Sequence, residues 1–217
     1  MTVRFRVPEM EGRTAHWYAR QRGTESQLRL VREQADELTE GLPAGTEILE
    51  VAPGPGYFAA ELARRGYTVT GLDISHTMVE IATEHARREG VTADFRHGDA
   101  TRMPFEAGRF DLVVCQAAFK NFLDPVGALN EMRRVLRPGG TAVIQDLNAE
   151  ATRADIAAEV QRMHLTRVNT VVTRLTLGWL RRRAQSPADF RSLAQRSAFG
   201  AADIRTDGIG LEVRLRA

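Results

Sequence analysis

The sequence predicts an α/β protein built on a doubly wound, mostly parallel sheet of seven strands with a C-terminal antiparallel strand. Between residues 46 and 148, apolar strand-like runs alternate with helical segments of roughly 10–15 residues, the pattern of a parallel sheet covered by helices. The first of these strands breaks directly into a glycine-rich turn. Near the C-terminus, two alternating segments are joined by the tight-turn dipeptide Asp207-Gly208, which predicts a closing hairpin.

The composition is that of a soluble globular domain. The chain has 217 residues, 43% of them hydrophobic and 27% charged, with a net charge of +2. No apolar run approaches the roughly 20 residues that span a bilayer, and residues 1–6 lack the apolar core of a secretory signal. Cys115 is the single cysteine, which excludes an internal disulfide and a cysteine-based metal cluster. We expect a single cytoplasmic domain with no metal, as a monomer or homodimer.

The expected elements follow from periodicity. Residues 1–45 are mostly helical and polar, with Leu28, Val31, Ala35 and Leu38 on one helical stripe. Strands are expected at 47–51, 68–72, 93–97, 110–116 and 141–146, with helices at 58–65, 75–88 and 125–136 between them. Residues 150–183 read as helical with mixed polarity, and Ser186-Pro187 is a helix start. Residues 203–206 and 209–215 alternate as the last two strands.

The turn after the first strand is a nucleotide-binding corner. Residues 48–56, Ile-Leu-Glu-Val-Ala-Pro-Gly-Pro-Gly, lead from a buried strand into a helix, so glycine backbone and helix amides face a ligand. Asp73, 17 residues after Gly56, ends the second strand and can bind ribose hydroxyls; the alternative is a helix cap, for which Ser75 competes. This corner alone fits either a dinucleotide or S-adenosylmethionine.

Motifs further along the chain decide between these cofactors. Gly98-Asp99-Ala100 follows the third strand, 103–105 is Met-Pro-Phe, 108–113 is Gly-Arg-Phe-Asp-Leu-Val, and 131–140 ends in Arg-Pro-Gly-Gly. This ordered series resembles the class I S-adenosylmethionine-dependent methyltransferases of the small-molecule branch, over residues 46–148. The resemblance implies a Rossmann-like fold with a helical lid at 1–45, a cofactor-binding core at 46–148, a substrate-side helical insertion at 149–200 and a closing strand pair at 201–217.

The resemblance also implies a cofactor site for S-adenosylmethionine, with S-adenosylhomocysteine as product. The methionine and ribose contacts would come from Glu50, Ala52, Gly54, Gly56 and Asp73, the adenine contacts from Ile74, Met78, Asp99 and Ala100, and the contacts near the sulfonium from Gln116 and the lid residue Tyr18. The turn departs from the family, in which glycine is common at position 52. Pro53 and Pro55 also stiffen the loop and remove two amide donors.

Methyl transfer requires positioning, and for some acceptors a general base. Lys120 and Asn121 lie just after the fourth strand, where the family faces its substrate; Lys120 binds an anionic group or acts as a base, or else is a surface lysine or pairs with Asp124. His16 is a further candidate base, with a solvated helix position as the alternative. His164 lies in the region that the family uses for substrate specificity, where it could face the pocket. Cys115 is expected to be buried in its strand.

The remaining features bear on partners. Five apolar residues suggest an acceptor pocket of partly apolar character, with a position in the hydrophobic core as the alternative: Phe119, Phe122, Val171, Leu175 and Trp179. Arg174 and Arg181 to Arg183 form a basic cluster, which binds an acidic partner or is a solvated helix face. We expect a small-molecule acceptor, no nucleic acid and no membrane. The competing functions are an NAD(P)-dependent oxidoreductase and a cofactor-binding module without turnover.

Overall fold

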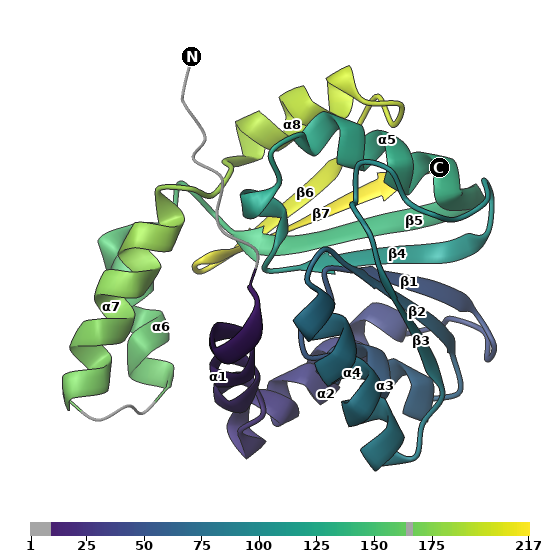
Figure 1. The fold of residues 1–217 in the computed structure, drawn as a ribbon. Coiled ribbons are helices and arrows are strands. Elements are labelled where there is room, and N and C mark those ends of the chain that lie inside the picture. The colour runs from purple at the N-terminus through teal and green to yellow at the C-terminus, as the bar shows by residue number, and fades with distance from the viewer. Residues whose placement is uncertain (1–9, 164–166) are drawn as a thin grey trace.

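A computed structural model describes residues 10–163 and 167–217 and shows a seven-stranded sheet (Figure 1). The strand order is β3-β2-β1-β4-β5-β7-β6, with β7 antiparallel to both of its neighbours. The strands are β1 (Glu47–Val51), β2 (Thr68–Asp73), β3 (Ala93–His97), β4 (Phe110–Gln116), β5 (Leu136–Leu147), β6 (Asp203–Asp207) and β7 (Gly210–Arg216). The predicted doubly wound sheet with an antiparallel C-terminal strand is therefore confirmed.

Helices cover both faces of the sheet. The helices are α1 (Gly12–Arg22), α2 (Glu25–Thr39), α3 (Tyr57–Arg64), α4 (His76–Glu89), a 3-10 turn η1 (Phe119–Asn121), α5 (Pro125–Val135), α6 (Arg153–Arg162), α7 (Arg167–Arg181) and α8 (Pro187–Arg196). Figure 1 shows α5 and α8 on one side of the sheet and α2, α3 and α4 on the other. In β4, Val113 and Cys115 pack toward the first group while Leu112 and Val114 pack toward the second. Burial on both faces explains the continuous apolar run of this strand.

The fifth strand is longer than the sequence indicates. It begins at Leu136 rather than at residue 141, so the Arg-Pro-Gly-Gly turn is part of the strand. The pairing with β4 is interrupted by a bulge between Phe110 and Leu112, and Gly139 has a φ of 83°. A Cβ on Gly140 would stand 2.9 Å from the carbonyl oxygen of Asp111. The two glycines thus allow an irregular but paired segment, which reads locally as a turn.

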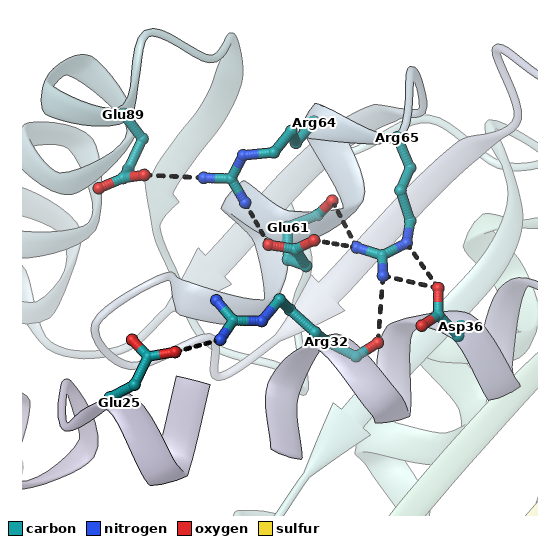
Figure 2. Close-up of polar contacts among 7 residues, drawn as sticks. All are labelled: Glu25, Arg32, Asp36, Glu61, Arg64, Arg65 and Glu89. Carbon is teal, nitrogen blue, oxygen red and sulfur yellow. Dashed lines mark hydrogen bonds and ion pairs between the residues drawn. The ribbon is translucent and has the colours of Figure 1, made fainter. Parts of the chain in front are cut away.

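A network of ion pairs joins the helices on the α2 side of the sheet (Figure 2). The carboxylate of Glu61 on α3 lies between the guanidinium groups of Arg64 and Arg65. Arg65 also donates to Asp36 on α2, at 2.7 Å, and Arg64 reaches Glu89 at the end of α4, at 2.8 Å. The two arginines that share this buried carboxylate therefore connect α3 to both neighbouring helices.

The remaining helices lie at the end of the sheet where the parallel strands finish. The α6–α7 pair follows β5 and stands apart from the helices that cover the sheet (Figure 1). In the described part of the chain, no helix has both the length and the apolar character needed to cross a bilayer.

Candidate active site

Backbone strain marks the carboxyl ends of the two central strands. Ala52 follows β1 with a φ of 58°, and Ala117 follows β4 with a φ of 53°. Among the described residues, these are the two non-glycine positions with positive φ. The left-handed region is costly for alanine and is found most often where a site requires it. Because β1 and β4 are adjacent, the two strained residues lie at neighbouring points of one edge.

The glycine-rich turn is shaped by close packing as well as by its backbone angles. Gly56 is the N-cap of α3 with a φ of 75°, and a Cβ there would lie 2.7 Å from the Cβ of Ala82 on α4. Gly54 has a φ of 54° and donates its N–H to Asp73, at 3.0 Å. Gly56 has no side chain with which to cap α3, and the first amides of the helix face the carboxyl edge of the sheet. The two prolines predicted to stiffen the turn are buried within it.

Glu50, the fourth residue of β1, carries a buried carboxyl group with an unused oxygen. Its side chain is 3% exposed, one carboxylate oxygen has no hydrogen-bond partner, and the backbone amide of Ala59 hydrogen-bonds the group. Burial raises the pKa of Glu50 to about 8, against the hydrogen bond from Ala59 and with added repulsion from Asp73. A buried acid with a free oxygen provides a place for a cationic group.

Asp73 is held in a fixed orientation at the end of β2. Its carboxylate accepts the N–H of Gly54 and, at 2.9 Å, the N–H of Ser75. Burial raises the pKa of Asp73 in spite of these amides. Ser75 itself caps α4 by accepting the N–H of Met78 at 3.0 Å, so the cap proposed as the alternative role of Asp73 belongs to Ser75.

The expected adenine contacts lie around the ends of β2 and β3. Ile74 is exposed, while Met78 is buried beneath it in the first turn of α4. Asp99 accepts the N–H and the hydroxyl of Thr101 on the same oxygen, at 2.8 and 2.9 Å, and Ala100 is partly buried. These hydrogen bonds fix the carboxylate of Asp99 while its second oxygen remains available.

The N-terminal helix lies over the glycine turn. A Cβ built on Gly54 would be 3.8 Å from the ring of Tyr18, so this tyrosine stands against the turn as the lid prediction requires. Glu11 accepts the amides of His76 at 2.8 Å and Thr77 at 3.0 Å at the start of α4, and these bonds lower its pKa to about 2, the Thr77 hydroxyl contributing most. The carboxylate of Glu11 therefore attaches the start of α1 to the start of α4, a contact that the sequence did not predict.

Lys120 is neither a surface residue nor paired with Asp124. Its ammonium group donates to Asp146 on β5, at 2.9 Å, and to the carbonyl of Ala117, while its own N–H donates to the second oxygen of Asp146, also at 2.9 Å. Lysine and aspartate are both buried, with side chains 5% and 1% exposed. This pair occupies the ammonium group and holds the strained Ala117 in place.

The other catalytic candidates are dispersed. His16 is exposed and lines a groove of about 630 Å³ with Glu80, Ile81 and other residues of α4, on a different side of α1 from Tyr18. Asn121 is exposed on η1. Gln116 donates to Gln145 on β5 at 2.8 Å, and His164 lies outside the described residues.

The expected apolar acceptor pocket divides into two groups. Phe119 is buried in the core and packs at a tilt against Phe122, with ring centroids 5.1 Å apart. Leu175 and Trp179 are instead exposed on α7, at 70% and 55%, so the core position that was the alternative to a pocket is excluded for these two residues. A residue that the sequence did not single out is Gln185, which is 3% exposed and whose carboxamide oxygen and nitrogen both lack a partner. Nothing in its sequence context distinguishes it from a surface glutamine.

Comparison with known proteins assigns the core that carries this site to a family. Residues 49–144 match the methyltransferase domain family. Residues 49–144 of this chain therefore form the core of a class I S-adenosylmethionine-dependent methyltransferase domain. A demethylmenaquinone methyltransferase from Deinococcus radiodurans is 37% identical over 107 residues, which are 48% of this chain and 44% of that protein. The chain thus matches less than half the length of this curated relative.

Solved structures extend the comparison beyond the core of the methyltransferase domain. The crystal structure of an S-adenosylmethionine-dependent methyltransferase from Aquifex aeolicus has a TM-score of 0.69 at 16% identity, covering 92% of this chain and 97% of that one, which shows the shared fold. The [4+2]-cyclase SpnF is 29% identical with a TM-score of 0.54, covering 59% of this chain and 47% of its own. The methyltransferase core is thus shared with proteins named for different reactions.

The residues of the methyltransferase core fit S-adenosylmethionine as methyl donor. This cofactor carries a sulfonium and an ammonium cation, and two buried acidic groups lie beside the glycine turn: the carboxylate of Asp73 and the carboxyl group of Glu50, whose free oxygen a cation would ionise. The family match also decides against the dinucleotide that the turn alone permitted.

Proposed function

We propose that this protein transfers a methyl group from S-adenosylmethionine to a small organic acceptor. The observation that carries the proposal is the buried, unpaired carboxyl oxygen of Glu50 next to Asp73, because burial keeps this acid protonated in the free protein and a bound cation would favour its ionised form. When bound, the cofactor supplies a methyl group already activated by a sulfonium. The protein therefore has to bind and orient the cofactor and the acceptor and shield them from water, rather than to activate the methyl group.

Each cofactor-site residue has a role in that arrangement. Glu50 faces the cationic methionine end, and Asp73, fixed by the amides of Gly54 and Ser75, receives the ribose hydroxyls. Asp99 offers its remaining oxygen to the adenine amino group. Tyr18, against Gly54, excludes water from the methionine end as part of a lid formed by residues 1–45.

The acceptor side lies at the carboxyl end of β4. Ala117 and Gln116 form its edge, and Lys120 is a positioning residue that fixes the Ala117 carbonyl and Asp146 beneath it. Methyl transfer is an in-line displacement, so a fixed approach to the methyl carbon supplies much of the rate. The α6–α7 region, within the insertion at 149–200, bounds the acceptor. The relative named as a demethylmenaquinone methyltransferase supports an aromatic, quinone-type acceptor.

Two measurements test the proposal. S-adenosylhomocysteine should bind by calorimetry, and Asp73→Asn should weaken binding by roughly 10-fold or more, since a charged hydrogen bond contributes about 1.5–3 kcal/mol. Asp94→Asn is the matched control, because Asp94 is an exposed carboxylate on β3 paired with Arg96.

Activity should then be followed as a methylated product from a panel of hydroxylated aromatic acceptors. Binding without any methylated product would support the cofactor-binding module. A thermal shift with NADH but none with S-adenosylmethionine would refute the assignment and restore the oxidoreductase alternative.

A further inference from the structure

The outer face of α7 is apolar although it is exposed. The large hydrophobic residues on it define an outer stripe: Val171, Val172, Leu175 and Trp179, all more than half exposed. At 100° per residue these side chains fall within an arc of roughly 100°, while the half-buried Leu177 and Leu180 lie on the opposite side of the helix, where α6 packs. A surface helix normally presents polar residues on the face away from its neighbours.

The charge around the outer stripe is of one sign. No Asp or Glu occurs between Glu159 and Asp189, whereas this segment holds six arginines at positions 162, 167, 174, 181, 182 and 183. Arg174 and Arg182 are exposed, and the guanidinium of Arg183 lies 5.2 Å from the centre of the Trp179 ring. In the second half of the helix, aliphatic and aromatic side chains are thus bordered by cations.

A groove runs beside the outer stripe between α6 and α7. It has a volume of about 500 Å³, and Ile156, Leu175 and Trp179 contribute apolar walls while Arg153 and Arg182 stand at its margin. Figure 1 shows this helix pair as an arm set off from the helices that cover the sheet. The arm can therefore approach an extended surface without the sheet obstructing it.

We propose that the outer stripe of α7 docks on an anionic lipid surface, with the apolar side chains at the level of the acyl chains and the arginines at the headgroups. A helix with Trp and Leu on one face and arginines on its flanks, and with no acidic residue, suits that interface. A second copy of this chain would bring arginines against arginines. A nucleic acid would pair with the arginines but leave Leu175 and Val172 without an apolar partner.

This docking revises the expectation that the protein has no membrane partner. The sequence lacks an apolar run long enough to span a bilayer, whereas α7 would lie in the plane of the surface. The inference goes beyond the proposed methyl transfer and does not depend on it, since binding to lipid requires neither cofactor nor turnover.

Vesicle sedimentation tests the proposal with the full chain. Binding is expected to vesicles of phosphatidylcholine containing phosphatidylglycerol, to weaken as NaCl rises, and to be much weaker with phosphatidylcholine alone. Leu175→Asn should reduce binding, whereas Leu30→Asn, at an exposed leucine on α2, should not. Arg174→Gln combined with Arg182→Gln should weaken binding by more than 10-fold, at roughly five-fold for each arginine.

The two tryptophans give a readout of orientation. Trp17 and Trp179 are equally exposed, at 55%, but lie on α1 and α7. Vesicles should shift the fluorescence of the Trp17→Phe variant, which reports Trp179, to shorter wavelength, and should shift the Trp179→Phe variant much less. Failure to bind anionic vesicles, or a shift confined to Trp17, would overturn the proposal; the first result would point instead to an acidic protein as the partner of α7.

Discussion

Replacement of Glu50 by glutamine should stabilise the protein at neutral pH while weakening the proposed cofactor binding. Glutamine keeps the shape of the side chain and removes its titration. In the folded protein the carboxyl group keeps its proton to about pH 8, whereas the ordinary value is 4.5. Between these values the folded state binds more protons than the unfolded chain, so the free energy of unfolding falls as pH rises.

The size of the effect follows from the pKa difference. At pH 7, about 2.5 units above the ordinary pKa, ionisation of Glu50 stabilises the unfolded chain while the folded protein keeps the proton, and at about 1.4 kcal/mol per unit this amounts to roughly 3.5 kcal/mol. Glu50→Gln should therefore match the wild type near pH 4 and exceed its stability by an amount approaching ~3.5 kcal/mol at pH 7. Urea unfolding at four values between pH 4 and 8 measures the difference.

A matched control and a binding experiment complete the test. Glu106→Gln, at an exposed carboxylate, should leave the pH profile unchanged. Because a bound cation favours the ionised form of Glu50, S-adenosylmethionine binding at pH 7 should release up to about one proton in the wild type and less in Glu50→Gln, measured by calorimetry in buffers of different ionisation enthalpy. Parallel stability curves for wild type and Glu50→Gln across pH 5–8 would refute the reasoning.

Other substitutions test particular features of the fold. Ala52→Gly should raise the free energy of unfolding by about 0.5–1 kcal/mol, because relief of a left-handed alanine outweighs the added freedom of the unfolded chain; Ala63→Gly, within α3, should lower it by about 1 kcal/mol, and equal signs for the pair would contradict the strain argument. Arg65→Ala should cost about 1–3 kcal/mol in chemical denaturation and more than Arg64→Ala, since Arg65 is the less exposed partner of the same carboxylate and also reaches α2. Gln185→Met should be neutral or stabilising by about 1–2 kcal/mol in thermal unfolding, because no buried hydrogen bond is lost; a marked loss of stability would show that the carboxamide has a partner.

The sequence predicted those parts of the structure that depend on local chemistry. The apolar run of β4, the Ser75 cap and the capped start of α8 each lie within a few consecutive residues, and all three were located correctly. The hairpin at the C-terminus was also predicted from a two-residue turn. These elements are specified by backbone preferences and by periodic burial.

Interactions between distant residues were not predictable in the same way. The partner of Lys120 is Asp146, 26 residues further along, and neither burial nor pairing is visible from the sequence around the lysine. The hydrogen bonds of Glu11 likewise come from residues that the chain brings close only on folding. The burial of the unpartnered carboxamide of Gln185 also depends on such distant residues. The apolar residues of α7 were assigned to a pocket because periodicity cannot tell an inward apolar face from an outward one.

The carboxylate of Glu11 has a consequence for the kinetics of ligand exchange. It closes the start of α4 from the side of α1, and the adjacent backbone carbonyl of Met10 accepts the hydroxyl of Ser75 at 2.7 Å, two residues from Asp73. A cofactor bound to Asp73 would leave past these contacts of Glu11 and Met10. Breaking the contacts would expose the amides of His76 and Thr77 at the same moment, so departure of the cofactor and fraying of α4 would share one barrier. The residence time of the bound cofactor would then be set by the N-terminal segment rather than by the contacts of the cofactor itself.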